Sequence, residues 1–191
     1  MHNKESSGTV LTMNTKNQRN IYTGEGHAHF ITFGTSGKRK VLGIAHARQI
    51  VISTLSSLTS KYRLNVCGFV IMPDHVHALF WLPDDLVLPD VMRVWKSTSA
   101  HWLRKYYERT NPDFINLLKT RRNGRELICF WQRRYYDFNV KSSEKAREKL
   151  DYMHNNPVKK GLCKYPEDWI WSSARWYKCH RSVGVDIVQV F

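Results

Sequence analysis

Phe69-Val-Ile-Met-Pro-Asp-His-Val-His-Ala-Leu-Phe-Trp-Leu82 consists of two apolar runs separated by Pro73-Asp74. Proline and aspartate favour a tight turn, so this stretch predicts two strands joined as an antiparallel hairpin. His75 and His77 are two residues apart in the second strand, and such residues point to the same face. The strand therefore presents two imidazoles side by side, and imidazole is the commonest side-chain metal ligand. The opposite face carries apolar side chains that need a core: Val76, Ala78, Phe80 and Leu82.

The elements around this hairpin predict an α+β, ferredoxin-like βαββαβ fold, an antiparallel sheet with two helices on one face and the other face free. The expected strands cover 29–33, 66–72, 75–82 and, in a bent form, 127–140; the expected helices cover 44–62 and 89–109. A third, C-terminal helix bears Tyr152. Ser142 or Ser143 is its expected N-cap, and Pro157 ends it. The domain is expected over 26–180, between a flexible basic tail (1–25) and a C-terminal tail (181–191).

Composition indicates a polyanionic partner. The chain has 191 residues and a formal net charge of +14, and 13% of its residues are aromatic. Arginines beside aromatic residues, as in Trp131–Tyr136 and Trp171–Arg181, suit single-stranded nucleic acid, where bases stack and phosphates pair with cations. The alternative is an aromatic core with a basic rim.

Other classes of protein are disfavoured. No run of about 18 apolar residues predicts a membrane helix, and the polar first 25 residues lack the apolar stretch of a signal peptide. The four cysteines are far apart, which disfavours a zinc site or a disulfide framework. A reduced, cytoplasmic setting is expected, with the protein on bacterial nucleoid DNA.

The third helix offers a lane of functional side chains at helical spacing. Lys145, Lys149, Tyr152 and Asn156 follow one side of the helix, about 100° from its apolar stripe. A phenol, an amide oxygen and two cations could then face one phosphate. The alternatives are a half-buried tyrosine that covers the sheet edge and an asparagine that merely ends the helix.

Four motifs occur in order along the chain: Gly68–His77, Trp131-Gln132 with Tyr136-Asp137, Asp151–Gly161 and Pro166–Arg175. Together they resemble the HUH single-strand DNA transposases that use one tyrosine, and the REP-associated tyrosine transposases most closely. The resemblance covers roughly residues 28–177. Two features depart from it. Phe138 stands where related sequences often have histidine, and the insert Asn111–Arg125 has no assigned place.

The resemblance implies a metal-dependent DNA strand transferase that cuts and rejoins hairpin or single-stranded DNA through a 5′-phosphotyrosine intermediate. It implies that Tyr152 is the nucleophile and that His75, His77 and Asn156 hold a divalent ion, Mg²⁺ or Mn²⁺. Eight cationic side chains are candidate DNA contacts: Arg93, Lys96, Arg133, Arg134, Lys145, Lys149, Lys159 and Lys160.

Several alternatives stay open at this point. His27-Ala28-His29 is a second His-x-His, interpreted as a decoy or a phosphate contact. Tyr135 and Tyr136 are alternative nucleophiles, and Asp74 is interpreted as a turn residue. His154 lies about 200° around the helix from Tyr152 and is expected to point elsewhere. The competing functions are a hairpin-binding relative that has lost cutting and a ferredoxin-like RNA binder. The protein is expected to be a monomer or a homodimer.

Overall fold

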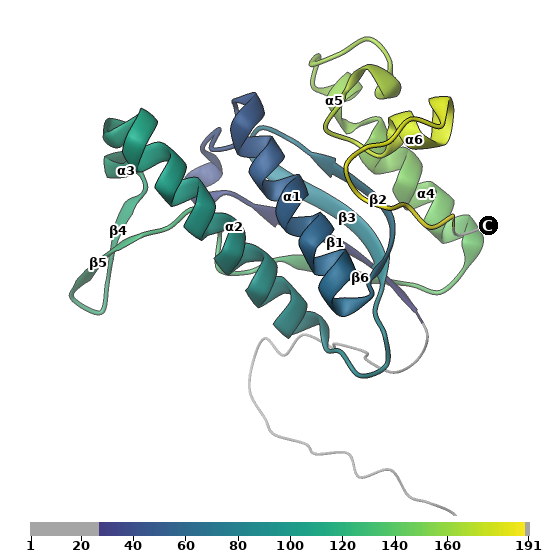
Figure 1. Ribbon diagram of the computed structural model, residues 1–191, viewed down its shortest axis with the longest axis horizontal. Helices are drawn as coiled ribbons and strands as arrows, with labels where there is room; N and C mark the ends of the chain where they lie inside the picture. The colour runs from purple at the N-terminus through teal and green to yellow at the C-terminus, as the bar shows by residue number, and fades with distance from the viewer. Residues whose placement is uncertain (1–26, 190–191) are drawn as a thin grey trace, which may run out of the picture.

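A four-stranded antiparallel sheet forms the centre of the computed structural model, which describes residues 27–189 except the side chain of Arg122. Its strands are β1 (Ala28–Gly34), β2 (Asn65–Ile71), β3 (His75–Trp81) and β6 (Tyr136–Val140), in the order β2-β3-β1-β6 (Figure 1). An antiparallel sheet with helices is therefore confirmed. The predicted tail over 1–25 lies outside the described residues.

The hairpin predicted around Pro73-Asp74 joins β2 to β3. Val70 lies opposite His77 and Ile71 opposite Val76. The Met72 amide donates to the His75 carbonyl oxygen over 2.8 Å, which closes the turn. Strand β2 ends at Ile71 and β3 begins at His75, so the turn occupies the three residues between them.

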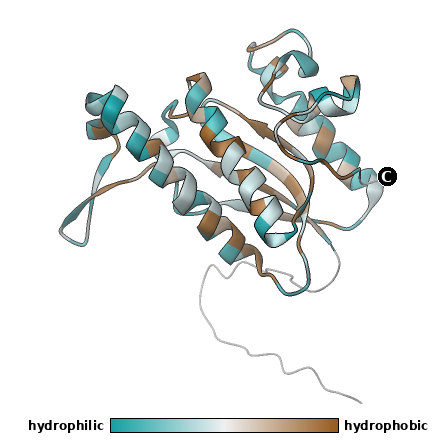
Figure 2. Cartoon of the chain, in the orientation of Figure 1, coloured by the Kyte–Doolittle hydropathy of each residue, from teal (hydrophilic) through white to brown (hydrophobic). Residues whose placement is uncertain are grey.

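Helices α1 (Ala45–Tyr62) and α2 (Leu88–Thr110) cover one face of the sheet and lie side by side (Figure 1). They bury Val51, Leu55 and Trp95 against the β3 side chains Val76, Ala78 and Phe80. Much of the sheet beneath them is apolar, as Figure 2 shows in brown. The apolar side of the His75–Leu82 stretch therefore faces these two helices.

The opposite face of the sheet, which α1 and α2 leave free, carries the C-terminal helix that bears Tyr152. Helix α4 (Ser143–His154) packs on it, because its stripe of Ala146, Leu150 and Met153 needs an apolar surface. Phe30, Cys67, Leu79 and Val140 provide that surface. The chain continues through α5 (Asn156–Lys159), the short 3-10 turn η2 (Pro166–Asp168) and α6 (Ala174–Cys179).

The single bent strand predicted over 127–140 is wrong. After α3 (Pro112–Leu117), β4 (Lys119–Arg122) and β5 (Arg125–Ile128) form a separate hairpin that projects from the body of the molecule (Figure 1). Phe130 and Trp131 then enter the α1–α2 core, and β6 begins only at Tyr136. The insert Asn111–Arg125 thus forms α3 and most of this hairpin, and burial of two large aromatic residues separates the hairpin from the sheet.

The C-terminal segment packs along the free edge of β2. The Ile71 amide donates to the Trp171 carbonyl oxygen, and the Val188 amide donates to that of Val66, each over 2.8 Å. Val183 and Val185 are buried. The segment predicted to be a tail beyond residue 180 therefore contributes to the core as far as it is described. No helix of the described residues is long and apolar enough to span a membrane.

Candidate active site

A row of side chains crosses the sheet on the face that carries α4. Thr32 of β1 lies opposite His77 of β3 on one side and opposite Tyr136 of β6 on the other. His75 precedes His77 by two residues and shares its face. The two imidazole rings have centroids 4.8 Å apart. Strand alternation therefore brings the two histidines together, as the spacing predicts.

His77 is held by hydrogen bonds at both ring nitrogens. Its Nδ1 lies 2.7 Å from Thr32 Oγ1, and the Asn156 amide nitrogen donates to its Nε2 over 2.8 Å. Burial, and secondarily the nearby His75, lowers the pKa of His77 to about 3, so the ring is neutral at pH 7. A neutral imidazole has one N–H. Since Nε2 accepts from Asn156, the Nδ1–H donates to Thr32.

His75 is oriented in the same way by its neighbour. Its Nδ1 lies 2.7 Å from Asp74 Oδ1, and a carboxylate can only accept, so Nδ1 carries the proton of this bond. Asp74 thus does more than form the turn. In both histidines Nδ1 is the donor, which leaves Nε2 as the nitrogen that can bind a ligand.

The cap and the packing of α4 position its polar lane. Ser142 accepts a hydrogen bond from the Lys145 amide over 3.3 Å, which identifies the N-cap. Leu150 and Met153 approach the sheet at Gly68, where an added β-carbon would lie 2.5 Å from Leu150 Cδ2 and 2.6 Å from Met153 Cε. The absence of a side chain at residue 68 therefore permits the close approach of α4 to β2.

Tyr152 and Asn156 both lie at the histidines, although α4 ends at His154 and Asn156 begins α5. The Tyr152 ring centroid is 5.5 Å from that of His77, and Phe30 contacts both rings from the sheet. Tyr152 is 47% exposed, whereas Asn156 is buried. The phenol is therefore open to a substrate from solvent, and the amide is fixed against the imidazole.

The four lysines predicted to contact DNA near this helix differ in how they lie relative to Tyr152. Lys159 Nζ lies 5.7 Å from the centroid of the Tyr152 ring, and Lys149 Nζ lies over Phe138 and Phe30 at 4.5 and 5.4 Å. Lys145 is further from the site and forms an ion pair with Glu148. Lys160 is exposed. Lys159 thus lies beside the Tyr152 ring, and Lys149 lies over Phe30, which contacts that ring.

The predicted arginines and Lys96 line two depressions beside the site. The first, of about 680 Å³, adjoins His75 and Asp74 and contains Arg134 and Lys38. The second, of about 440 Å³, lies between α2 and the Trp131 segment and contains Arg93, Lys96 and Arg133. Both depressions share Tyr135. Cationic side chains therefore continue outward from the histidines toward α2.

The other candidates lie elsewhere or have other partners. His29 is buried on the α1–α2 side of the sheet and lies 3.1 Å from Asp137, between Nδ1 and Oδ1. His154 does point away from Tyr152, because its Nε2 lies 2.7 Å from Ser173 Oγ. Burial lowers the pKa of His154 to about 4. Tyr136 is exposed on the candidate-site face, opposite Thr32.

The donor set at the site fits a divalent ion. No group of three or more His, Cys, Asp or Glu side chains that could hold a metal occurs within 27–189. An ion here would therefore take His75 and His77 through Nε2, displacing the Asn156 N–H from His77, and a rotation of the Asn156 amide would direct its oxygen to the same ion. Imidazole and amide ligands suit Mn²⁺, and the anchored Nδ1 atoms resemble the outer contacts of metal-binding histidines.

Three supporting residues escaped the sequence analysis. Thr32 anchors His77, Gly68 admits α4, and Ser173 connects His154 to β2 by accepting from the Phe69 amide over 2.9 Å. Alternation in the first predicted strand could have placed Thr32 on the histidine face, given the order of the strands. Ser173 carries no such signal, since it lies in an irregular segment.

Comparison with known proteins identifies the family of this chain. The family model described as "Transposase IS200 like" matches residues 22–156, a range that includes His75, His77, Tyr152 and Asn156. A Haemophilus influenzae protein assigned to the REP-associated tyrosine transposases is 27% identical over 135 residues, which cover 71% of this chain and 70% of the relative. The REP-associated tyrosine transposase of Escherichia coli K12 is 23% identical over 154 residues, 80% of this chain and 79% of the relative.

A solved structure supports the same fold. A REP-associated tyrosine transposase bound to a REP hairpin superposes with a TM-score of 0.65 over 92% of this chain and 94% of that chain, at 18% identity. The resemblance inferred from the four motifs is therefore confirmed. Because the family model covers most of the chain, this protein belongs to the family of IS200-like transposases.

Proposed function

We propose that this chain is a metal-dependent transposase that cuts and rejoins single-stranded DNA beside a hairpin, with Tyr152 as the nucleophile. The observation that carries the proposal is the contact of Asn156 with His77 Nε2, beside a phenol ring 5.5 Å from the same imidazole. Two imidazoles, an amide and an accessible tyrosine thus meet at one point. Asp74 holds the His75 ring through its Nδ1, and Thr32 holds the His77 ring in the same way.

The chemistry follows from these residues. The Tyr152 oxygen attacks phosphorus, and the new phenol O–P bond replaces the P–O3′ bond. The phenol proton goes to solvent, and the leaving oxygen takes a proton from solvent to become a 3′ hydroxyl. The number of phosphodiester bonds is conserved, so a 3′ hydroxyl can reverse the step and rejoin DNA. A divalent ion held by His75, His77 and Asn156 supplies Lewis-acid polarisation of the phosphate oxygen.

Two lysines, Lys149 and Lys159, would stabilise the negative charge that develops on the same phosphate. Lys159 lies beside the Tyr152 ring, and Lys149 lies about one helical turn before Tyr152 on α4. Both place positive charge where the transferring phosphate develops negative charge. Arg134, in the depression at His75, extends this charge toward the approaching strand. The hairpin class of substrate is supported by the structural neighbour, which is bound to a REP hairpin.

A covalent trapping assay tests the proposal. A 3′-labelled hairpin with a single-stranded flank is incubated with the protein in Mn²⁺, and the protein–DNA adduct is separated on a denaturing gel. The label is placed at the 3′ end because the phosphotyrosine bond retains the fragment downstream of the cut. Tyr152→Phe should abolish the adduct and leave hairpin affinity within about twofold, because phenylalanine retains the ring contact to His77 and lacks only the nucleophile.

Tyr136→Phe is the matched control, since Tyr136 is equally exposed on the same face of the sheet. It should form the adduct as the wild type does. Loss of the adduct in Tyr136→Phe with retention in Tyr152→Phe would assign the nucleophile to β6. Hairpin binding with no adduct in the wild type would instead support a protein that has lost cutting.

A further inference from the structure

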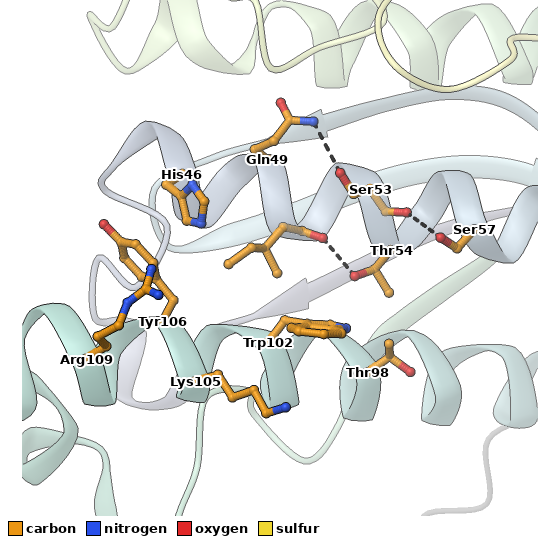
Figure 3. A pocket seen from close by; sticks show the side chains of 11 residues that line it. His46, Gln49, Ser53, Thr54, Ser57, Thr98, Trp102, Lys105, Tyr106 and Arg109 are labelled. Carbon is orange, nitrogen blue, oxygen red and sulfur yellow. Dashed lines mark hydrogen bonds between the residues drawn. The ribbon is translucent and has the colours of Figure 1, made fainter.

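A groove lies between α1 and α2, on the sheet face opposite the histidines. It has a volume of about 470 Å³ and is shown in Figure 3. Helix α1 contributes His46, Gln49, Ile50, Ser53, Thr54 and Ser57, and helix α2 contributes Thr98, Trp102, Lys105, Tyr106 and Arg109. A cavity of this size falls within the range of ligand sites.

Small polar side chains and one exposed indole shape this groove. Thr54 of α1 points toward Trp102 of α2, and Ser53 and Ser57 lie further from Trp102 on α1 (Figure 3). Trp102 is 51% exposed, whereas Trp95, two turns earlier on α2, is completely buried. The indole therefore offers a flat apolar surface to solvent. The Thr54 hydroxyl opposite it donates to the Ile50 carbonyl oxygen over 2.7 Å, so its proton is used within α1.

The charge of the groove is entirely positive. Lys105 Nζ lies 5.0 Å from the Trp102 ring centroid, and Arg109 stands at the end of the groove where His46 and Tyr106 pack with ring centroids 4.4 Å apart. No carboxylate lines the groove, and neither Lys105 nor Arg109 forms an ion pair with another residue in the described part of the chain. The charge complement of this surface is an anion.

The groove also continues the cationic surface that starts at the histidines. The depression with Arg93, Lys96 and Arg133 lies on the other side of α2, and its Ser97 is adjacent in sequence to Thr98 of the groove. Only the width of one helix thus separates the two surfaces. A DNA strand that leaves the candidate site past Arg134 would meet cationic side chains on both sides of α2.

We infer that the α1–α2 groove binds single-stranded DNA that flanks the hairpin, with one base stacked on Trp102 and its phosphates paired with Lys105 and Arg109. This inference rests on the proposed function for the identity of the substrate. An aromatic face beside cations is the arrangement by which proteins hold single strands without reading their sequence. The groove adds affinity for the flank and takes no part in the chemistry at Tyr152.

Binding of two labelled hairpins tests the inference. One has a single-stranded flank of about 10 nucleotides, within the length that single-strand binding sites cover, and the other has none. Trp102→Ala should weaken binding of the flanked hairpin by about 10-fold, the effect of losing one stacked base, and leave the unflanked hairpin unchanged. Trp102→Phe should retain most of the affinity, because it keeps an aromatic face.

The cations are tested by salt dependence. In Lys105→Gln/Arg109→Gln, the slope of log K against log salt for the flanked hairpin should become shallower by about 1.4, since each phosphate contact to a single strand contributes about 0.7. Tyr165→Ala is the matched control: Tyr165 is 52% exposed, and Lys164 Nζ lies 5.2 Å from its ring. Tyr165→Ala should leave the difference in affinity between the flanked and the unflanked hairpin unchanged.

Photocrosslinking separates this inference from the proposed function. A bromodeoxyuridine in the flank should crosslink to the peptide that contains Trp102, and it should do so equally in Tyr152→Phe, which cannot cut. A flank effect without any covalent adduct would leave the groove assignment standing and overturn the catalytic proposal. Equal affinity for the two hairpins, or full flank affinity in Trp102→Ala, would overturn the groove assignment.

Discussion

Replacement of Thr32 by valine tests how the site is supported. Valine has nearly the same shape and strand preference as threonine but offers no acceptor to His77 Nδ1, which lies 2.7 Å from the hydroxyl in wild type. His77 is only 3% exposed, so water cannot replace the lost partner. An unsatisfied buried donor costs about 1–3 kcal/mol, and we expect Thr32→Val to lower the free energy of unfolding by that amount.

The same change should weaken the proposed metal site. Loss of an outer contact to a metal-binding histidine typically lowers metal affinity by about 10–100-fold. That range corresponds to about 1.4–2.8 kcal/mol and agrees with the hydrogen-bond estimate. Urea unfolding measures the first effect, and calorimetric titration with Mn²⁺ measures the second without any DNA present.

Thr32→Ser is the matched control, because it keeps the hydroxyl and should restore Mn²⁺ affinity to near the wild-type value. Unchanged stability in Thr32→Val would refute the hydrogen-bond argument. Lowered stability with unchanged Mn²⁺ affinity would show that the Thr32–His77 contact is structural only, and that the orientation of the imidazole does not depend on it.

Two further predictions concern α4. Gly68→Val should lower the free energy of unfolding in urea by about 1–3 kcal/mol and slow adduct formation. The valine side chain would displace Leu150 and Met153 and so move Asn156 away from His77. Asn65→Val, at an exposed position of the same strand, should have neither effect. Acid should also destabilise the fold. Between pH 6.5 and about pH 4, the unfolded chain protonates His154 while the folded chain keeps it neutral, so stability falls by up to about 1.4 kcal/mol for each pH unit of acidification. His77, with its pKa near 3, acts in the same direction. His154→Gln should flatten the dependence of unfolding free energy on pH, and a slope equal to that of wild type would contradict this account.

Local periodicity explains why much of the fold was predictable. A strand repeats every two residues and a helix every 3.6, so the shared face of His75 and His77 and the apolar stripe of α4 follow from spacing alone. The turn at Pro73-Asp74 and the Ser142 cap are equally local. Prediction failed over 127–140, where one run of strand-forming residues contacts three different parts of the fold. Its first residues pair with β4, Phe130 and Trp131 enter the α1–α2 core, and β6 pairs with β1.

The sequence by itself determined the β2–β3 hairpin, the shared face of the two histidines, the basic charge and the position of Tyr152 on the polar side of its helix. Each of these depends on composition or on neighbours within a few residues. Only the tertiary structure decided which groups support them. Thr32 is 45 residues from His77 in sequence, and Asn156 is 79 residues from it. Such contacts depend on strand order and on how closely α4 can approach Gly68, and these are properties of packing between elements rather than of any one segment.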